Sequence, residues 1–121
     1  LCAPHVSQLL GVKALAMHPK YVEKMRKEYD RRRVYLVQRL NGMGLTTMKP
    51  EGTFYTFSNI TSTKMKSLAF TEKLLKEAKV AVVPGTEFGN AGEGYIRLSY
   101  ATEFHTIIKA MDKLERFLKK R

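Results

Sequence analysis

The chain is 121 residues long and 44% hydrophobic, which is enough for one modest core and ordinary for a folded domain. No apolar run approaches the roughly 20 residues that a membrane-spanning helix requires, and residues 1–17 lack the basic start and small-residue cleavage site of a signal peptide. The net charge is +11, but the scattered basic residues form no arginine-glycine repeat or aromatic RNA-binding signature, so we interpret them as a solvated surface without a nucleic-acid partner.

The first residues predict an extended segment followed by a helix. Pro4 disfavours a helical conformation at Ala3, so residues 1–5 are expected to be extended. Ser7 is a candidate cap for a helix that runs to about Met17. Its apolar side chains, at helical spacing, are Leu9, Leu10, Val12, Leu15 and Ala16.

A second, longer helix is predicted over residues 20–40. His18 and Pro19 separate it from the first helix, and proline suits the first turn of a helix. Asn41 and the glycines at positions 42 and 44 then end it. The apolar stripe of this helix consists of Val22, Met25, Tyr29, Leu36 and Leu40.

The middle of the chain predicts short strands and a third helix. Residues 45–48 are a candidate short strand, and residues 49–52 predict a turn. Residues 53–57, rich in threonine and aromatic side chains, predict a strand. The polar residues 59–66 are expected to form a loop, and a helix is predicted over residues 67–78.

Residues 80–101 predict two strands around a glycine-rich loop. Residues 80–83 are an apolar, strand-favouring run that Pro84 and Gly85 end. Residues 95–101 alternate with the period of a strand. Ile96, Leu98 and Tyr100 are predicted on one face, and Tyr95, Arg97, Ser99 and Ala101 on the other. The glycines at 85, 89, 92 and 94 favour turns over a phosphate-binding loop, because they do not open a helix after a strand.

The last element is predicted to be a helix over residues 103–120, with Thr102 as its cap. Its regular apolar spacing predicts a buried face made of Ile107, Met111, Leu114 and Leu118. The element order favours an α+β fold in a single domain spanning residues 1–121: a small, mostly antiparallel sheet with helices packed on one face.

Arg97 is the unusual residue of the last predicted strand. An unpaired buried guanidinium is very unfavourable, so Arg97 needs an anionic partner or a path to water. Its role is therefore either a structural ion pair or the binding of an anionic ligand. The ion-pair candidates are Glu87, Glu93 and Glu103, and Tyr55, Phe88 and Tyr95 are candidates to line a binding site.

The histidines and the cysteine predict no metal or redox site. His5, His18 and His105 are dispersed and lack metal-ligand spacing. Cys2 is the only cysteine, so it has no internal disulfide partner, and no nearby motif indicates a reactive thiol. A single cysteine fits a reducing compartment, and a cytoplasmic location is expected.

Several motifs, in this order and spacing over nearly the whole chain, resemble the C-terminal segment of class I/II aminotransferases, which are fold-type I pyridoxal-phosphate enzymes. The similarity is strongest to the aspartate aminotransferase branch. One motif reads Val-x-Val-x-Pro-Gly, then Phe-Gly, then Gly-x-x-Arg-x-Ser-x-Ala, and consists of Val80, Val82, Pro84, Gly85, Phe88, Gly89, Gly94, Arg97, Ser99 and Ala101. The others are Pro50-Glu51-Gly52-Thr53-Phe54-Tyr55, Arg31-Arg32-Arg33 and Cys2-Ala3-Pro4 followed by Gln8.

The resemblance implies that this chain is the small domain alone. It assigns Arg97 to the substrate α-carboxylate, which a guanidinium binds with two parallel hydrogen bonds. The family keeps the Schiff-base lysine, the acid at the pyridine nitrogen and the phosphate donors in its large domain, which is absent here. The chain is therefore expected to hold no catalytic, cofactor-binding or metal-binding residue and to be inactive alone. Its start at Leu1, without a methionine, favours a fragment or a processed product.

The intact enzyme is expected to be a homodimer that transfers an amino group between an amino acid, of aspartate or aromatic type, and a 2-oxo acid. In such a dimer, residues 1–5 would approach the partner subunit. In the isolated domain they are expected to be poorly ordered or held by a non-native contact. Two alternatives stay open: a free-standing basic binding module, and a decarboxylase, lyase or acyltransferase of the same superfamily. The reading frame upstream of Leu1 distinguishes the first alternative from the enzyme fragment. A large domain with a Schiff-base lysine there would support the fragment, and a start codon close to Leu1 would support the binding module. These residues do not define which amino-acid side chain the intact enzyme selects in its substrate.

Overall fold

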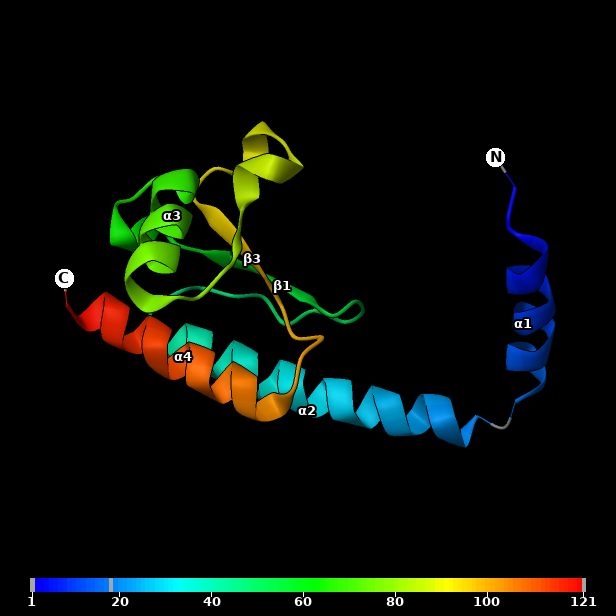
Figure 1. Ribbon diagram of the computed structural model, residues 1–121. Coiled ribbons are helices and arrows are strands. Elements are labelled where there is room, and N and C mark those ends of the chain that lie inside the picture. The colour runs from blue at the N-terminus through cyan, green and yellow to red at the C-terminus, as the bar shows by residue number, and fades with distance from the viewer. Residues whose placement is uncertain (1, 18, 121) are drawn as a thin grey trace.

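The computed structural model describes residues 2–17 and 19–120, so predictions for Leu1, His18 and Arg121 fall outside the described residues. Figure 1 shows a small sheet above two long helices, with the N-terminal helix standing apart. In chain order, the elements are α1 (His5–Ala16), α2 (Lys20–Gly42), β1 (Tyr55–Asn59), η1 (Thr61–Thr63), α3 (Ser67–Ala78), β2 (Val83–Pro84), η2 (Gly85–Phe88), η3 (Asn90–Gly92), β3 (Tyr95–Ser99) and α4 (Phe104–Lys119).

The sheet has three antiparallel strands in the order β1-β3-β2, which confirms the predicted α+β class. Phe57 of β1 and Val83 of β2 both lie opposite Arg97 of the central strand. The predicted alternation of β3 is confirmed, because Ile96, Leu98 and Tyr100 are buried while residues on the other face are partly or fully exposed.

The buried face of the sheet packs against the helices. Its side chains join those of α2, α3 and α4 in one apolar core, which supplies the main driving force for folding. The core consists of Leu36, Leu40, Leu45, Ile60, Phe70, Leu74, Val80, Ile96, Leu98, Tyr100, Ile107, Met111, Leu114 and Phe117. Helices therefore cover one face, as predicted, and the face that carries Arg97 is left for contact with a ligand or with another part of a protein.

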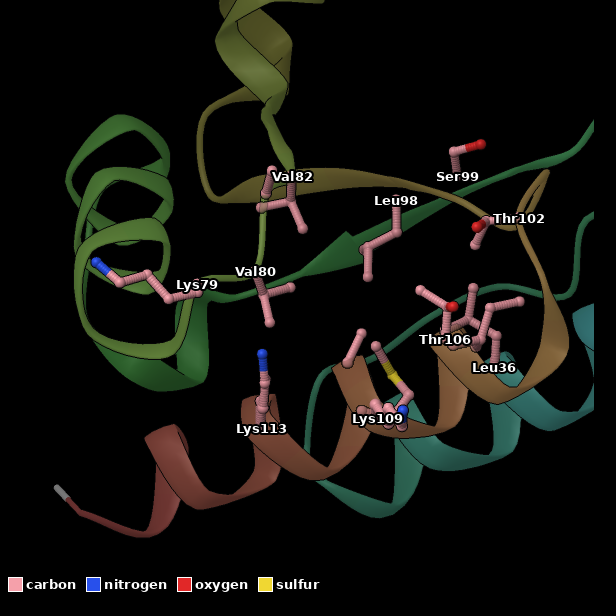
Figure 2. Close-up of a pocket in the computed structure, with 14 residues that line it drawn as sticks. Leu36, Lys79, Val80, Val82, Leu98, Ser99, Thr102, Thr106, Lys109 and Lys113 are labelled. Carbon is pink, nitrogen blue, oxygen red and sulfur yellow. The ribbon is translucent and has the colours of Figure 1, made fainter.

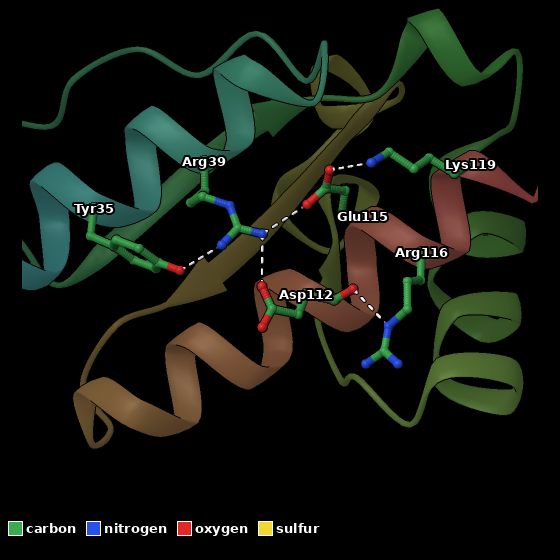
Figure 3. Close-up of polar contacts among 6 residues, drawn as sticks. All are labelled: Tyr35, Arg39, Asp112, Glu115, Arg116 and Lys119. Atoms are coloured by element: carbon green, nitrogen blue, oxygen red, sulfur yellow. Dashed lines mark hydrogen bonds and ion pairs between the residues drawn. The ribbon is translucent and has the colours of Figure 1, made fainter.

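A polar cluster fixes α4 against the second half of α2 (Figure 3). Arg39 of α2 donates hydrogen bonds to Asp112 at 2.9 Å and to Glu115 at 3.0 Å, and a third to the Tyr35 hydroxyl at 2.6 Å. Lys119 lies 2.6 Å from the other Glu115 oxygen, and its hydrogen bond, with the charge of Arg39, holds the pKa of Glu115 below its usual range. The cluster sets the pairing of the two helices that support the sheet.

The helix that was predicted to start at Ser7 begins at His5. Pro4, with φ −57°, is the N-cap residue of this helix, so Ser7 lies inside the helix and is not its cap. Likewise, α4 starts at Phe104 after Glu103, so the prediction of Thr102 as its cap was wrong. Both helices start without a side-chain cap hydrogen bond.

The apolar stripes of the first two helices are mostly exposed, and the predicted buried face of the last helix needs one correction. All described residues of α1 are exposed, and Leu15 is 90% exposed. In α2, Leu36 and Leu40 are buried but Val22 and Met25 are 72% and 52% exposed, because this half of the helix extends past the sheet (Figure 1). In α4, Phe117 is buried and Leu118 only partly, because Phe117 meets the Phe70 ring at 5.6 Å.

The strands are shorter than predicted, for local reasons. Residues 45–48 contribute only an isolated bridge at Thr47, whose backbone bonds the Asn41 side chain instead of a ladder partner. β1 starts at Tyr55 because Thr53 has φ 66°, which a strand does not allow. β2 contains only Val83 and Pro84, and an edge strand tolerates proline because its missing N–H faces away from the ladder. The predicted loop at 59–66 contains the last residue of β1 and the short helix η1.

No helix in the described ranges 2–17 and 19–120 is both long and apolar enough to cross a membrane.

Candidate functional site

Two aromatic rings hold the guanidinium of Arg97. Its central carbon lies 4.2 Å from the centre of the Tyr55 ring and 4.6 Å from that of the Phe88 ring. Tyr55 comes from the neighbouring strand β1 and Phe88 from η2, so the fold brings these side chains together from three segments. Attraction between a cation and a ring face restrains the guanidinium without using its N–H groups, which remain available for an anion.

Arg97 faces an open cavity of about 610 Å³. The lining is mostly apolar, and Arg97 is its one charged residue among those described. The cavity is lined by Thr46, Met48, Pro50, Thr53, Tyr55, Thr56, Phe57, Asn59, Tyr95 and Arg97. A single guanidinium in an apolar hollow is suited to a small carboxylate whose remainder is less polar.

Arg97 forms no ion pair with Glu87, Glu93 or Glu103 in the described part of the chain. Glu93 accepts hydrogen bonds from the backbone of Ser67 and Gly94, and Glu103 lies 3.1 Å from His105. The guanidinium thus keeps its capacity for an external anion.

Of the candidate lining residues, Tyr55 and Tyr95 line the cavity with Arg97, whereas Phe88 contacts the guanidinium without being part of the lining. The structure adds Phe57, which stacks on Tyr95 with ring centres 5.3 Å apart and meets Phe88 edge-on at 5.9 Å. Sequence reasoning missed Phe57, although strand alternation from Tyr55 points both side chains to one face.

The glycine-rich segment that carries Phe88 is pinned to α3. The buried hydroxyl of Ser67 accepts hydrogen bonds from the backbone N–H groups of Gly94 and Tyr95, at 2.9 and 3.2 Å. The Glu93 carboxylate accepts from the backbone N–H of Ser67 at 2.8 Å and caps the start of α3. This bond, with that from Gly94, holds the pKa of Glu93 below its usual range. The segment is therefore fixed at its base, and Phe88 has a defined position above Arg97.

Gly85 and Gly92 make the backbone contact that closes this segment. A Cβ at Gly92 would lie 2.0 Å from the Gly85 carbonyl oxygen, a distance no side chain tolerates. Gly92→Ala is expected to lower the free energy of unfolding by about 1–3 kcal/mol, because backbone must move to admit the methyl group. Urea unfolding of the 121-residue chain measures this.

Gly42→Ala is the matched control for that substitution. Gly42 lies at the end of α2, and a Cβ there meets nothing within 4 Å. Alanine at this position is expected to leave stability unchanged or to raise it. Equal unfolding midpoints for the Gly92→Ala chain and the parent would mean that the glycine contact does not close the segment.

A second hollow, of about 340 Å³, lies between α4 and the buried end of the sheet (Figure 2). Leu98 points into it and Ser99 points away, while Lys113 extends its amino group toward Val80. Its charged lining groups are the lysines Lys79, Lys109 and Lys113, whose flexible ammonium groups do not give the paired hydrogen bonds of a guanidinium to a carboxylate. The Arg97 cavity is the better candidate for a binding site.

Within residues 2–17 and 19–120, no group of three His, Cys, Asp or Glu side chains is placed to hold a metal ion, and Cys2 is exposed. Lysine is also missing from the described lining of the Arg97 cavity. The cavity therefore offers binding and orientation by Arg97 and its aromatic neighbours, but no nucleophilic amine.

Comparison with known proteins gives consistent matches. A sequence model of the family described as "Aminotransferase class I and II" matches residues 1–114. The "Aspartate aminotransferase" of Pyrococcus abyssi is 56% identical over 102 residues, which are 84% of this chain and 26% of that protein. The "Aromatic-amino-acid aminotransferase 2" of Thermococcus litoralis is 54% identical over 100 residues, 83% of this chain and 26% of that protein.

A solved structure agrees with these matches. The crystal structure of an aromatic aminotransferase from Pyrococcus horikoshii OT3 superposes with a TM-score of 0.87 at 56% identity, covering 90% of this chain and 30% of that one. The chain thus spans between a quarter and a third of the length of the relatives named here.

Proposed function

Since this chain belongs to the class I and II aminotransferase family, we propose that residues 1–121 are the C-terminal small domain of a pyridoxal-phosphate enzyme. The intact enzyme transfers an amino group between an amino acid, of aspartate or aromatic type, and a 2-oxo acid. In this proposal Arg97 binds the substrate α-carboxylate. The family resemblance that the motifs indicated is confirmed by the match over residues 1–114.

One observation carries the assignment of Arg97: its guanidinium contacts the rings of Tyr55 and Phe88 at an open cavity whose described lining holds no acid. The rings of Tyr55 and Phe88 limit the directions that the guanidinium can take, so its N–H groups meet a carboxylate in a defined orientation. Two parallel hydrogen bonds would fix both the position and the plane of that carboxylate. Orientation of this kind lowers the entropy that the reacting groups must lose later.

We assign the cofactor to a large domain outside these residues. Pyridoxal phosphate, when bound, supplies an aldehyde for the amino group and a ring that accepts electrons. The described lining of the Arg97 cavity has no lysine for a Schiff base and no acid for the pyridine nitrogen, so this chain does not fit the cofactor by itself. Its own residues bind and orient the substrate.

Exposed apolar side chains support a larger assembly. Val6, Leu10 and Leu15 of α1 are 65%, 61% and 90% exposed, and such a surface is usually covered by protein. We propose that the large domain and a second subunit of a homodimer cover it. The cytoplasmic location stays a prediction.

The two alternatives have less support. A free-standing basic binding module does not account for a single restrained arginine in an apolar cavity. A decarboxylase, lyase or acyltransferase of the superfamily would use the same arginine, so only the reaction products separate these from a transaminase.

Borohydride reduction tests whether the lysine that binds the cofactor lies outside residues 1–121. The full-length protein and the 121-residue chain are each mixed with pyridoxal phosphate, reduced, digested and mapped by mass spectrometry. In the full-length protein we expect one modified lysine outside residues 1–121, and in the chain alone no stoichiometric adduct, because a buried, activated lysine is required. A single stoichiometric adduct on a lysine of this chain would contradict the proposal.

A further inference from the structure

The turn at residues 50–53 is a thin wall between two hollows. On one side, Pro50 and Thr53 line the Arg97 cavity. On the other side, the same two residues line a hollow of about 330 Å³ against α2, together with Arg26 and Tyr29. Because both sides are open, packing alone does not fix the position of this wall.

Thr53 holds a backbone conformation that threonine rarely adopts. Its φ is 66°, in the left-handed region, where a β-branched side chain is strained. Such a conformation persists only where the surroundings enforce it, and it is found more often at functional sites than elsewhere. The surroundings that enforce it here are hydrogen bonds to both ends of the turn.

Tyr100 holds the Thr53 end of the turn. Its side chain is 1% exposed, and its hydroxyl donates a hydrogen bond of 2.8 Å to the Thr53 carbonyl oxygen. Its backbone N–H donates to the Phe54 carbonyl oxygen at 2.9 Å, and its ring meets the Tyr29 ring edge-on at 6.2 Å. Burial raises the pKa of this hydroxyl, which therefore stays a donor.

Arg33 holds the Pro50 end of the turn. Its guanidinium donates a long hydrogen bond of 3.5 Å to the Pro50 carbonyl oxygen. Asp30, one turn earlier in α2, accepts a hydrogen bond of 3.0 Å from the Arg33 Nε and orients the side chain. Arg33 of helix α2 and Tyr100, the residue that follows strand β3, thus hold the two ends of the same wall.

We propose that Tyr100 and Arg33 are positioning residues, which hold the turn at residues 50–53 at a fixed distance from Arg97 and so set the shape of the substrate site. This inference rests on the proposed function of Arg97. A wall of this kind contacts the bound substrate before and during the reaction, so loosening it weakens substrate binding more than it slows turnover.

Two variants of the full-length protein test the proposal. Tyr100→Phe removes the hydroxyl and keeps the ring, and we expect KM for the amino acid to rise roughly three- to tenfold with kcat within about twofold. Thr53→Gly relieves the strained φ, so its unfolding midpoint should not fall, yet the freed turn should raise KM by a similar factor of roughly three to ten. A purely structural role does not separate KM from stability in this way.

Thr71→Val is the matched control. Its hydroxyl is also buried and bonds a backbone carbonyl, that of Leu68, but it lies in α3 away from the cavity. We expect this variant to lose some stability and to keep the parental KM.

Arg97→Lys, measured in parallel, separates this inference from the function on which it rests. If Arg97→Lys impairs turnover while Tyr100→Phe and Thr53→Gly keep the parental KM, the positioning role is overturned and the proposed function stands. If Arg97→Lys keeps parental kinetics, both are overturned. Should Tyr100→Phe fail to fold, Thr53→Gly alone decides, because no loss of stability is expected for it.

Discussion

Arg97→Lys in the full-length protein is expected to lower kcat/KM for the amino acid by about a hundredfold or more, equivalent to about 3 kcal/mol of transition-state binding. Lysine keeps the charge but is a compact, flexible ammonium, which does not form the paired hydrogen bonds that a planar guanidinium gives a carboxylate. It also loses part of the contact with the Tyr55 and Phe88 rings, which lie 4.2 and 4.6 Å from the guanidinium carbon.

Steady-state kinetics with the amino acid and the 2-oxo acid measure the effect, and the absorbance of the bound cofactor provides a second measurement. The cofactor absorbance is expected to stay at the parental level, because the cofactor is assigned to a different domain. Arg116→Lys is the matched control: Arg116 is an exposed arginine of α4 whose Nε donates a hydrogen bond to the Asp112 backbone carbonyl. Near-parental kcat/KM in Arg97→Lys would instead favour a structural role for Arg97.

The elements that the sequence predicted well have a pattern that matches their surroundings. Helix Ser67–Ala78 was predicted at the observed bounds, and the alternation of β3 gave the correct buried face. Both segments lie in the core of the chain, where periodicity reports burial directly. Arg97 was found for the same reason, since a charge in an alternating strand is conspicuous.

Helical periodicity did not show which apolar stripes are buried within the described residues. The sequence showed apolar residues at helical spacing in α1, and nothing in the described chain covers them. The same holds for Val22 and Met25 in the first half of α2. Periodicity predicts that a face is to be covered but does not say by what, and we assign the covering to the rest of the enzyme.

The wall of the site could not be predicted because its conformation opposes local preference. Thr53 and Phe54 fit the composition of a strand, yet Thr53 has φ 66° and β1 begins only at Tyr55. The Tyr100 hydroxyl that enforces this turn is 47 residues away along the chain. Contacts of that range override intrinsic β-propensity, which is itself weak.

Leu114→Ala in the 121-residue chain is expected to lower the free energy of unfolding by about 2–5 kcal/mol. Leu114 is fully buried in the core between α4 and the sheet, so alanine removes its contacts and leaves a cavity that close-packed neighbours fill only in part. Urea unfolding followed by circular dichroism measures the loss as a lower midpoint with an unchanged slope.

Leu75→Ala is the control for this substitution. It is the same exchange of leucine for alanine within a helix, but the Leu75 side chain is 51% exposed. Little apolar surface returns to water there, so a loss of less than about 1 kcal/mol is expected. The difference between the two variants isolates burial from helix propensity, which is the same for both exchanges. If the two leucine variants unfold at the same urea concentration, α4 does not pack on the sheet as described, and the support that holds β3 and Arg97 in place must come from elsewhere.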